Sequence, residues 1–311
     1  MTTAEGAPAG LRGAKILVTG ASGNIGLPLV EHLVPDNDVW AVARFTDATA
    51  RDRLDAAGAT TDAVDLGADD LDGLPDDFDH VIHLATFGQG GLDFDAALEM
   101  DAVGTGMVLA HCRRARSALV MSTGAVYRPA DDPTHPYLET DPLGDAAIAG
   151  APAYSVSKIS QEAVARACAR MYDLPVVIPR MNSAYGANGG LVAWHLDRIM
   201  AGKPVRLAAH GIRYSPIHQD DINLQTASML RAASVPATIV NWGGDEVFGP
   251  DEWCADAAEL TGQDVEIVAG DARGYTSCVY DVTKRLAVTG PCTVTRREGV
   301  RRTLEARYPD R

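Results

Sequence analysis

The sequence predicts an α/β protein in which a doubly wound parallel sheet is joined to a smaller mixed α/β lobe toward the C-terminus. Between residue 14 and about residue 180, short apolar runs of strand length alternate with helix-length segments. A glycine-rich turn separates the first apolar run from the first helix, as in sheets that bind nucleotides. After Gly186 the alternation ends and the elements become mixed.

The first part of the chain contains six predicted strands. In chain order they span residues 14–19, 38–43, 60–64, 79–85, 118–121 and 174–178. Helices are predicted over 27–33, 94–115 and 152–172, and loops over 86–91 and 131–150. Parallel strands joined by helices bind their ligands at the carboxyl edge of the sheet, so we expect the site there.

The second part is predicted to be a smaller lobe of helices and short strands. Helices are expected over 191–200 and 219–233, and strands over 204–207 and 238–241. The stretches 251–260, 265–268 and 295–308 complete a small mixed region. A loop over 211–218 connects two of these elements. We expect the strand 238–241 to rejoin the sheet of the first part.

Charge and composition exclude several classes of partner. The 311 residues carry a formal charge of -15 with a pI near 4.8, which disfavours nucleic acids and anionic membranes as partners. No apolar run approaches the ~20 residues that span a bilayer, and the first 13 residues lack the features of a signal peptide. The five cysteines contain no Cys-x-x-Cys pair. We expect a soluble cytoplasmic protein with reduced thiols.

No metal site is expected. His80 and His83 lie three positions apart on one predicted strand, so they face opposite sides of the sheet and do not easily share a metal ion. Both are interpreted as structural residues.

The turn with Gly20, Gly23 and Gly26 predicts a phosphate-binding site. Glycines let the backbone approach a pyrophosphate, whose charge is then held by amides at the N-terminus of the following helix. The alternative is a tight turn without a ligand. Its place between an opening strand and a helix favours the phosphate site, and hence a dinucleotide.

Arg44 ends the second predicted strand, where nicotinamide-binding folds often keep an acid for the ribose hydroxyls. A guanidinium there can pair with a 2′-phosphate, whereas an acid would repel it. This favours NADP over NAD. The alternative is an arginine that stacks on adenine and does not select between the two cofactors.

Tyr154 and Lys158 are the candidate acid/base pair. Pro152 fits the first turn of a helix, and residues four apart on a helix share a face. A nearby ammonium is expected to lower the pKa of the phenol from about 10, so that it exchanges a proton with an alcohol oxygen. The pair alone is weak evidence, because nine tyrosines and four lysines give such a spacing by chance about one time in eight.

Taken together, seven segments resemble the motifs of the extended short-chain dehydrogenase/reductases, in the NAD-dependent epimerase/dehydratase group. They are Thr19-Gly20-x-x-Gly23-x-x-Gly26, Asp65-Leu66, His83-Leu84-Ala85-Thr86, Ser122-Thr123-x-x-Val126-Tyr127, Tyr154-x-x-x-Lys158-x-x-x-Glu162, Ile217-His218-x-x-Asp221 and Asn241-x-Gly243-Gly244. The resemblance extends from about residue 15 to residue 260.

The resemblance implies a Rossmann-type fold with three parts. We expect a flexible tail over residues 1–13, a dinucleotide-binding domain over 14–185 and a mainly substrate-binding lobe over 186–311. Residues 217–243 are expected to return to the Rossmann sheet. A homodimer formed by the helices 94–115 and 152–172 is also implied.

The resemblance further assigns roles to individual residues. The catalytic set is Thr123, Tyr154 and Lys158, with the threonine hydroxyl bonded to the reacting oxygen. The cofactor-binding residues are Gly20, Ser22, Gly23, Asn24, Ile25, Gly26, Arg44, Asp65, Leu66, Leu84, Ala85, Thr86, Ser122, Tyr154, Lys158, Met181 and Asn182. The substrate residues are Phe87, Ala125, Ser183, Tyr185 and Arg213.

Departures from the group's pattern narrow the expected reaction. Its dehydratases place Asp-Glu after the catalytic threonine, where this chain has Gly124-Ala125, so sugar dehydration is not expected. Asp101 and Ser183 stand where asparagine is usual. The 211–216 loop differs in spacing from the form that binds sugar-nucleotide diphosphates, which leaves Arg213 either a phosphate ligand or a structural residue.

These observations favour an NAD(P)(H)-dependent oxidoreductase that transfers hydride reversibly at a secondary alcohol or ketone. The alternative is a nucleotide-sugar epimerase that resembles UDP-glucose 4-epimerase and retains NAD. A remote third hypothesis is a dinucleotide-sensing protein without catalysis. The substrate is a small molecule in the first two.

Overall fold

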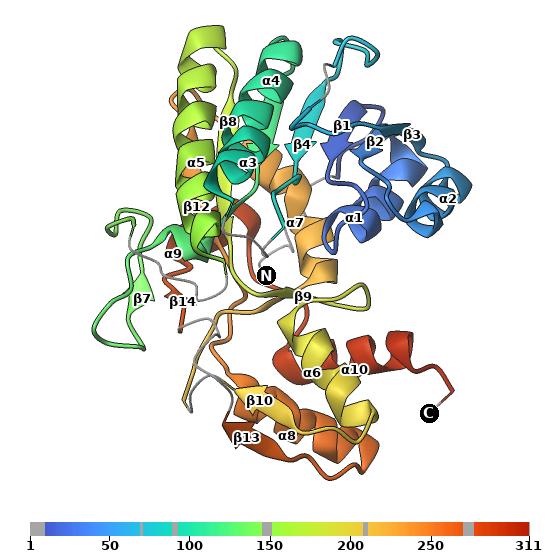
Figure 1. Cartoon of the computed structure of the whole chain (residues 1–311), viewed down its shortest axis with the longest axis vertical. Helices are drawn as coiled ribbons and strands as arrows, with labels where there is room; N and C mark the ends of the chain where they lie inside the picture. Colours follow the sequence, from blue (N-terminus) through green and yellow to red (C-terminus); the bar gives the residue numbers. More distant parts are fainter. Residues whose placement is uncertain are drawn as a thin grey trace, which may run out of the picture.

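A parallel α/β sheet domain and a smaller lobe make up the computed structural model shown in Figure 1. The structure describes residues 10–68, 71–88, 93–144, 151–207, 211–269 and 277–310. The predicted fold class is confirmed: a sheet flanked by helices on both faces, with a mixed lobe beside its carboxyl edge.

Within the described residues, the central sheet has eight strands, and all its pairings are parallel. The strands are β1 (Lys15–Thr19), β2 (Asp38–Ala43), β3 (Thr60–Ala63), β4 (His80–His83), β5 (Ser117–Val120), β6 (Ser122–Thr123), β8 (Val176–Met181) and β12 (Thr238–Trp242). Their order is β12-β8-β5-β4-β1-β2-β3, and β6 pairs with β8. The chain reverses direction across the sheet between β1 and β4, which is where such sheets bind ligands.

Helices cover both faces of the sheet because its strands are apolar on both sides. Ile16 and Val18 of β1 pack into one core with α1 (Gly26–Leu33), α2 (Ala48–Ala57) and α7 (Gln219–Arg231). Leu17, between them, points to the opposite core. The elements over that second face are α3 (Phe94–Leu98), η2 (Glu99–Val103), α4 (Gly104–His111) and α5 (Pro152–Tyr172).

The single helix predicted over 94–115 is wrong in two respects. A π-helical turn over Glu99–Val103 interrupts it, with the Gly104 amide bonded to the Glu99 carbonyl, and α4 ends at His111. The helix crosses close over Leu66: a Cβ on Gly104 would lie 3.0 Å from the Leu66 carbonyl oxygen. Because the apolar pattern continues through the wide turn, the sequence reads as one helix.

The lobe has its own core around Trp253, whose side chain is fully buried. Its elements are α6 (Leu191–Met200), β10 (Val205–Leu207), α8 (Pro250–Thr261), β13 (Ile267–Ala269) and α10 (Arg296–Arg307). Figure 1 shows them below the sheet domain. β10 and β13 form a two-stranded parallel sheet.

Short paired strands connect the sheet domain with the lobe. β9 (Ala184–Tyr185) pairs with β11 (Ile217–His218), and β7 (Pro136–Tyr137) pairs with β14 (Val279–Tyr280). The remaining short elements are η1 (Val34–Asp36), η3 (Gly124–Val126) and α9 (Thr283–Thr289). After β11 the chain returns through α7 to β12, which pairs with β8 at the sheet edge.

Two helices, α2 and α9, were not predicted from the sequence because they lack an apolar face. Leu54 is the one buried residue of α2, and the buried residue of α9 is an arginine, Arg285. Among the described residues, none of the helices combines the length and the apolar character needed to cross a bilayer.

Candidate active site

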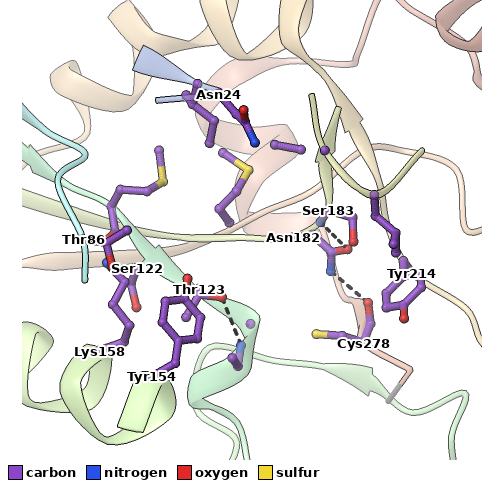
Figure 2. Close-up of a pocket in the computed structure, with 18 of the residues that line it drawn as sticks. Asn24, Thr86, Ser122, Thr123, Tyr154, Lys158, Asn182, Ser183, Tyr214 and Cys278 are labelled. Carbon is purple, nitrogen blue, oxygen red and sulfur yellow. Dashed lines mark hydrogen bonds between the residues drawn. The ribbon is translucent and has the colours of Figure 1, made fainter. Parts of the chain in front are cut away.

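A cavity of about 390 Å³ opens between the carboxyl edge of the sheet and the lobe. Figure 2 shows its lining: Tyr154, Lys158 and Thr123 lie together on one side, and Asn182, Ser183 and Tyr214 lie across from them. The first group comes from α5 and β6, and the second from the segments around β9 and before β11. The cavity therefore lies where the sheet topology predicts a ligand site.

Tyr154 and Lys158 face the cavity from the first two turns of α5. The helix starts at Pro152, whose fixed backbone angle suits a first helical position. The four-residue spacing puts both side chains on the face that packs against the sheet, and Lys158 is almost fully buried. Its Nζ donates to the Met121 carbonyl at 2.9 Å and to Gln161 Oε1 at 2.7 Å.

Burial raises the pKa of the Tyr154 phenol to about 12, while its hydrogen bond with the Thr123 hydroxyl acts in the opposite direction. The sequence predicted a lowered pKa caused by Lys158. That expectation is wrong for this structure because the ammonium is bound by Met121 and Gln161, and desolvation is the larger effect. Burial likewise lowers the pKa of Lys158, against the raising effects of Asp101 and Glu162.

Thr123 ends β6 and caps the short helix η3, where its Oγ1 accepts a hydrogen bond from the Ala125 amide at 3.2 Å. This capping bond fixes the hydroxyl beside the Tyr154 phenol (Figure 2). Two hydroxyls therefore meet at one point of the cavity wall, an arrangement that can bind one substrate oxygen.

Asp101, where the group usually has asparagine, lies fully buried behind Tyr154 and Lys158. Its Oδ1 accepts from the Phe87 amide at 2.7 Å, and its Oδ2 accepts from Ser157 Oγ at 2.6 Å. The carboxylate raises the pKa of both Tyr154 and Lys158. It thus supports the phenol's protonated form through space rather than by contact.

Replacing Asp101 with Asn should lower the pH at which Tyr154 titrates. The amide keeps an acceptor for Phe87, and Ser157 can reorient to accept from it, so the fold is retained. Removing the charge should shift the pH profile of turnover toward acid by roughly one unit. With increasing pH, the rate of ketone reduction would then begin to fall, and the rate of alcohol oxidation would begin to rise, at a lower pH than in the parent protein. Asp95→Asn, at an exposed site on α3, is the control; identical profiles for D101N and the parent would contradict the account.

Behind Lys158, a buried hydrogen-bond network fixes the floor of the cavity. Gln161 Nε2 donates to Thr105 Oγ1 at 2.9 Å, and Thr105 Oγ1 donates to the Asp101 carbonyl at 2.5 Å. Thr105 Oγ1 must then accept from His83 Nε2, 2.8 Å away, which leaves His83 Nδ1 to accept from Thr19. Burial lowers the pKa of His83 to about 3, so the ring is neutral and structural, as predicted from sequence.

The glycine turn between β1 and α1 forms the opposite end of the cavity. Gly20 has a φ of +69°, and a Cβ there would lie 2.6 Å from the Ala85 amide nitrogen. A Cβ on Gly26 would lie 2.3 Å from the Gly20 carbonyl oxygen. The N-terminus of α1 has no side-chain cap, and its Leu27 amide is bonded to the Gly23 carbonyl, so an anion at this end would be held by amides earlier in the turn.

These features fit a nicotinamide dinucleotide. A diphosphate is suited to the glycine turn and the uncapped helix, and Lys158 lies at the other end of the same cavity. The structure thus brings the predicted phosphate site and the candidate acid/base pair to one cavity.

Most residues predicted from sequence line this cavity. They are Gly20, Gly23, Asn24, Ile25, Gly26, Leu84, Thr86, Ser122, Thr123, Ala125, Tyr154, Lys158, Met181, Asn182 and Ser183. Those that lie outside its lining are Ser22, Arg44, Asp65, Leu66, Ala85, Phe87, Tyr185 and Arg213.

Three of the outlying cofactor candidates flank the glycine turn. Ser22 is exposed within the turn, and Arg44 is exposed at the end of β2. Ala85 contacts the turn through its backbone, close to Gly20. Their positions are compatible with contacts to the outer part of a dinucleotide.

The predicted adenine contact, Asp65-Leu66, follows β3. Asp65 Oδ1 accepts from the Gly67 amide at 3.1 Å, and the buried Leu66 packs under Gly104. Of the substrate candidates, Phe87 is bound through its amide to Asp101 and packs against a core of the sheet domain.

Tyr185 and Arg213 point away from the cavity. Tyr185 is buried in the core of the lobe, where its ring packs edge-on against His218. Arg213 Nη1 donates to the Ile212 carbonyl at 3.0 Å and pairs with Asp251 at 3.3 Å. Both side chains hold parts of the lobe together.

Sequence reasoning missed several lining residues, mostly aromatic or small ones. They include Met121, Gly124, Tyr127, Pro129, Tyr137, Ala184, Gly190, Leu191, Trp194, Tyr214, Ser277 and Cys278. Gly124 and Tyr127 had a local signal, because both lie in the segment that contains Thr123. So did Tyr214: neighbours on an extended segment point in opposite directions, so only one of Arg213 and Tyr214 is expected at the cavity wall. The others come from three separate regions of the chain, around residues 121–137, 184–194 and 277–278.

The fold and the site together define a dinucleotide-binding enzyme fold of the extended short-chain dehydrogenase/reductase type. The chain belongs to the NAD dependent epimerase/dehydratase family, whose model matches residues 16–243. The search of curated proteins found no match.

Solved structures with this fold include UDP-sugar epimerases. UDP-glucuronic acid 4-epimerase from Bacillus cereus, in complex with UDP-glucuronic acid and NAD, has a TM-score of 0.83 at 21% identity, over 95% of this chain and 99% of that one. UDP-glucose 4-epimerase from Thermotoga maritima, with UDP-glucose, has a TM-score of 0.80 at 20% identity, over 94% and 98%. MoeE5, in complex with UDP-glucose and NAD, has a TM-score of 0.79 at 25% identity, over 94% and 98%.

Proposed function

We propose that the protein transfers hydride reversibly between a nicotinamide dinucleotide and the carbon of a secondary alcohol or ketone. The observation that carries the proposal is the meeting of Thr123, Tyr154 and Lys158 on one wall of the cavity that the glycine turn closes. Proton exchange at an oxygen and hydride exchange at its carbon require these parts side by side.

Tyr154 holds the proton that the reaction moves. Since its pKa is raised to about 12, the phenol is protonated at neutral pH and can give its proton to a carbonyl oxygen. In the oxidative direction the phenol must first lose that proton, so oxidation is favoured by higher pH. When bound, the cofactor supplies or accepts the hydride.

Thr123 and Lys158 orient the reacting groups. The Thr123 hydroxyl, fixed by the Ala125 amide, donates to the same substrate oxygen that Tyr154 protonates. The Lys158 ammonium, held by Met121 and Gln161, is placed to act as a donor for the cofactor's ribose. In the proposed arrangement, residues 14–185 hold the cofactor and the lobe after residue 186 covers the substrate.

Gly124 supports the exclusion of sugar dehydration. A Cβ at this position would lie 2.5 Å from Tyr280 Oη and 2.7 Å from Cys278 Sγ. An acidic side chain directly after Thr123, as in the dehydratases of the group, therefore has no space here without rearranging two neighbouring residues.

The second candidate is a nucleotide-sugar epimerase that oxidises and re-reduces its substrate with retained NAD. The UDP-sugar epimerases of the same fold favour it. The two candidates share the Tyr154 chemistry and differ in whether the cofactor leaves. A cofactor that copurifies and stays bound through gel filtration would support the epimerase; net consumption of added cofactor would support the oxidoreductase.

NAD is the cofactor named in the complexes of two of these neighbours, whereas the preference for NADP rests on Arg44 alone. We propose a nicotinamide dinucleotide and test the choice at this residue. Arg44→Asp should weaken NADP binding roughly tenfold or more and leave NAD binding nearly unchanged, because the carboxylate repels a 2′-phosphate. The dissociation constants of NAD and of NADP, measured for R44D and for the parent protein, test this choice of cofactor. The control is Arg53→Ala, which removes an exposed arginine paired with Glu31. Equal NADP affinity in R44D and in the parent protein would contradict a preference for NADP that depends on Arg44.

We also propose a homodimer through the helical elements α3, η2, α4 and α5. Their exposed apolar side chains include Phe94, Val103, Met107, Val156 and Met171. Pairing of such helices between two copies would remove these side chains from water. Light scattering should give twice the chain mass of 32.8 kDa; a monomer mass at micromolar concentration would contradict this proposal and leave the chemistry untouched.

A further inference from the structure

The part of the cavity beyond Thr123 and Tyr154 carries almost no charge. Of the described residues that line the cavity, Lys158 is the one with a charged side chain. Its ammonium already donates to the Met121 carbonyl and to Gln161 Oε1, and it belongs to the catalytic wall. A substrate with phosphate groups would find no guanidinium among these residues.

Aromatic rings form much of the substrate side. Tyr127 and Tyr137 stack with their centroids 4.8 Å apart and their planes at 22°. Their hydroxyls are bound within the protein: Tyr127 Oη donates to Asn241 Oδ1, and Tyr137 Oη accepts from the Ala130 amide. Both side chains are almost fully buried and their rings stack on each other, so they close this part of the cavity with a small apolar wall and present no free polar group to it.

Trp194 and Leu191 extend this surface from the lobe. Both are on the first turns of α6 and line the cavity, and Trp194 keeps 50% of its surface exposed. An indole left half exposed beside a cavity is typical of a ring-binding surface, because stacking on a ligand would remove apolar area from water. The same cavity of about 390 Å³ must also accept the nicotinamide end of the cofactor, which limits the substrate to a small molecule.

The loop before β11 places a buried tyrosine at the cavity wall and an arginine outside the lining. Tyr214 lines the cavity and is paired with Phe248 and Cys278 through backbone bridges, so the segment is extended there. Its neighbour Arg213 accordingly faces the other way and pairs with Asp251. A second diphosphate, placed on the substrate side away from the glycine turn, would lose water without gaining this cation, which is unfavourable.

We infer that the substrate is a small, uncharged ketone or secondary alcohol carried on an aromatic or alicyclic ring, held against Trp194 and Leu191. The inference rests on the proposed hydride transfer and names its substrate class. The ring lies on the lobe side, and its oxygen lies between Thr123 and Tyr154.

Binding to the cofactor-saturated protein tests the inference without relying on turnover. Calorimetric titration with α-tetralone, cyclohexanone and UDP-glucose should show binding of at least one ring ketone and none of UDP-glucose at matched concentrations. Trp194→Ala should weaken ketone binding about tenfold and abolish the part of the fluorescence quenching that comes from this indole. Trp194→Arg, at a half-exposed position of the cavity lining, should gain affinity for UDP-glucose, because it puts a guanidinium beside the cavity.

Arg213→Ala is the matched control, since it removes the neighbouring arginine outside the cavity and should change no ligand's affinity. The inference is overturned by tight UDP-glucose binding that Arg213→Ala abolishes, or by a failure of every ring ketone to bind. Failure of the proposed function is a distinct result: ring ketones would bind as expected but would never be reduced by the cofactor-loaded protein.

Discussion

Tyr154→Phe is expected to lower turnover by roughly 10²- to 10⁴-fold, with nicotinamide cofactor binding nearly unchanged. The change removes the proton donor and keeps the ring that packs in the first turn of α5. The remaining hydroxyl, Thr123, is held by the Ala125 amide and can still bind the substrate oxygen, so substrate affinity should fall much less than turnover. Steady-state kinetics and direct cofactor titration measure the two effects separately.

The control for this prediction lies on the same helix. Tyr172→Phe makes the same chemical change at the C-terminal end of α5, outside the cavity lining. It should leave turnover unaffected. Equal turnover in Tyr154→Phe and Tyr172→Phe would exclude Tyr154 as the acid/base and with it the proposed reaction.

Glu162→Ala should destabilise the fold by about 3–5 kcal/mol, the largest effect expected for a residue outside the cavity. Glu162 accepts two hydrogen bonds from Arg180, both at 2.8 Å, and both side chains are almost fully buried. Without the carboxylate, the guanidinium would remain buried with no counter-charge. Urea unfolding of variant and parent measures the loss.

The same pair predicts a pH dependence of stability. Burial alone would raise the pKa of Glu162, but the Arg180 hydrogen bonds and charge lower it below its ordinary value of 4.5. Its contribution is therefore complete above about pH 4.5 and is lost as the pH falls through the lowered folded pKa. Glu162→Ala should remove this part of the acid sensitivity.

An exposed ion pair provides the comparison. Arg301 and Glu305 pair on the surface of α10, where water screens them, so Glu305→Ala should cost less than about 1 kcal/mol. If the two glutamate variants lose the same stability, the buried pair has no special role. The pair matters for the site because Ser122, next to Thr123, also donates to Glu162, at 2.6 Å.

Features that depend on local spacing were predictable from the sequence. The order of strands and helices, the glycine turn and the shared face of Tyr154 and Lys158 follow from periodicity and from turn chemistry. Thr123 was predictable for the same reason, since it ends a strand at the carboxyl edge. All of these need information from only a few neighbouring residues.

Features that depend on packing were not predictable. The direction of the Tyr154 pKa shift follows from burial and from the partners that bind Lys158, which no spacing rule reveals. The choice of Tyr214 over Arg213 as the inward residue depends on how the loop pairs with Phe248. The aromatic surface combines Tyr127, Tyr137 and Trp194, which are far apart in the sequence.

Transfer of a label tests the central claim most directly. The protein is incubated with reduced nicotinamide cofactor carrying deuterium at C4 and with a neutral ring ketone that binds. The account predicts that deuterium appears on the carbinol carbon of the product, in step with the loss of nicotinamide absorbance, and that Tyr154→Phe suppresses both. Interconversion of a UDP-sugar with retained cofactor, and no label in any ketone product, would contradict it.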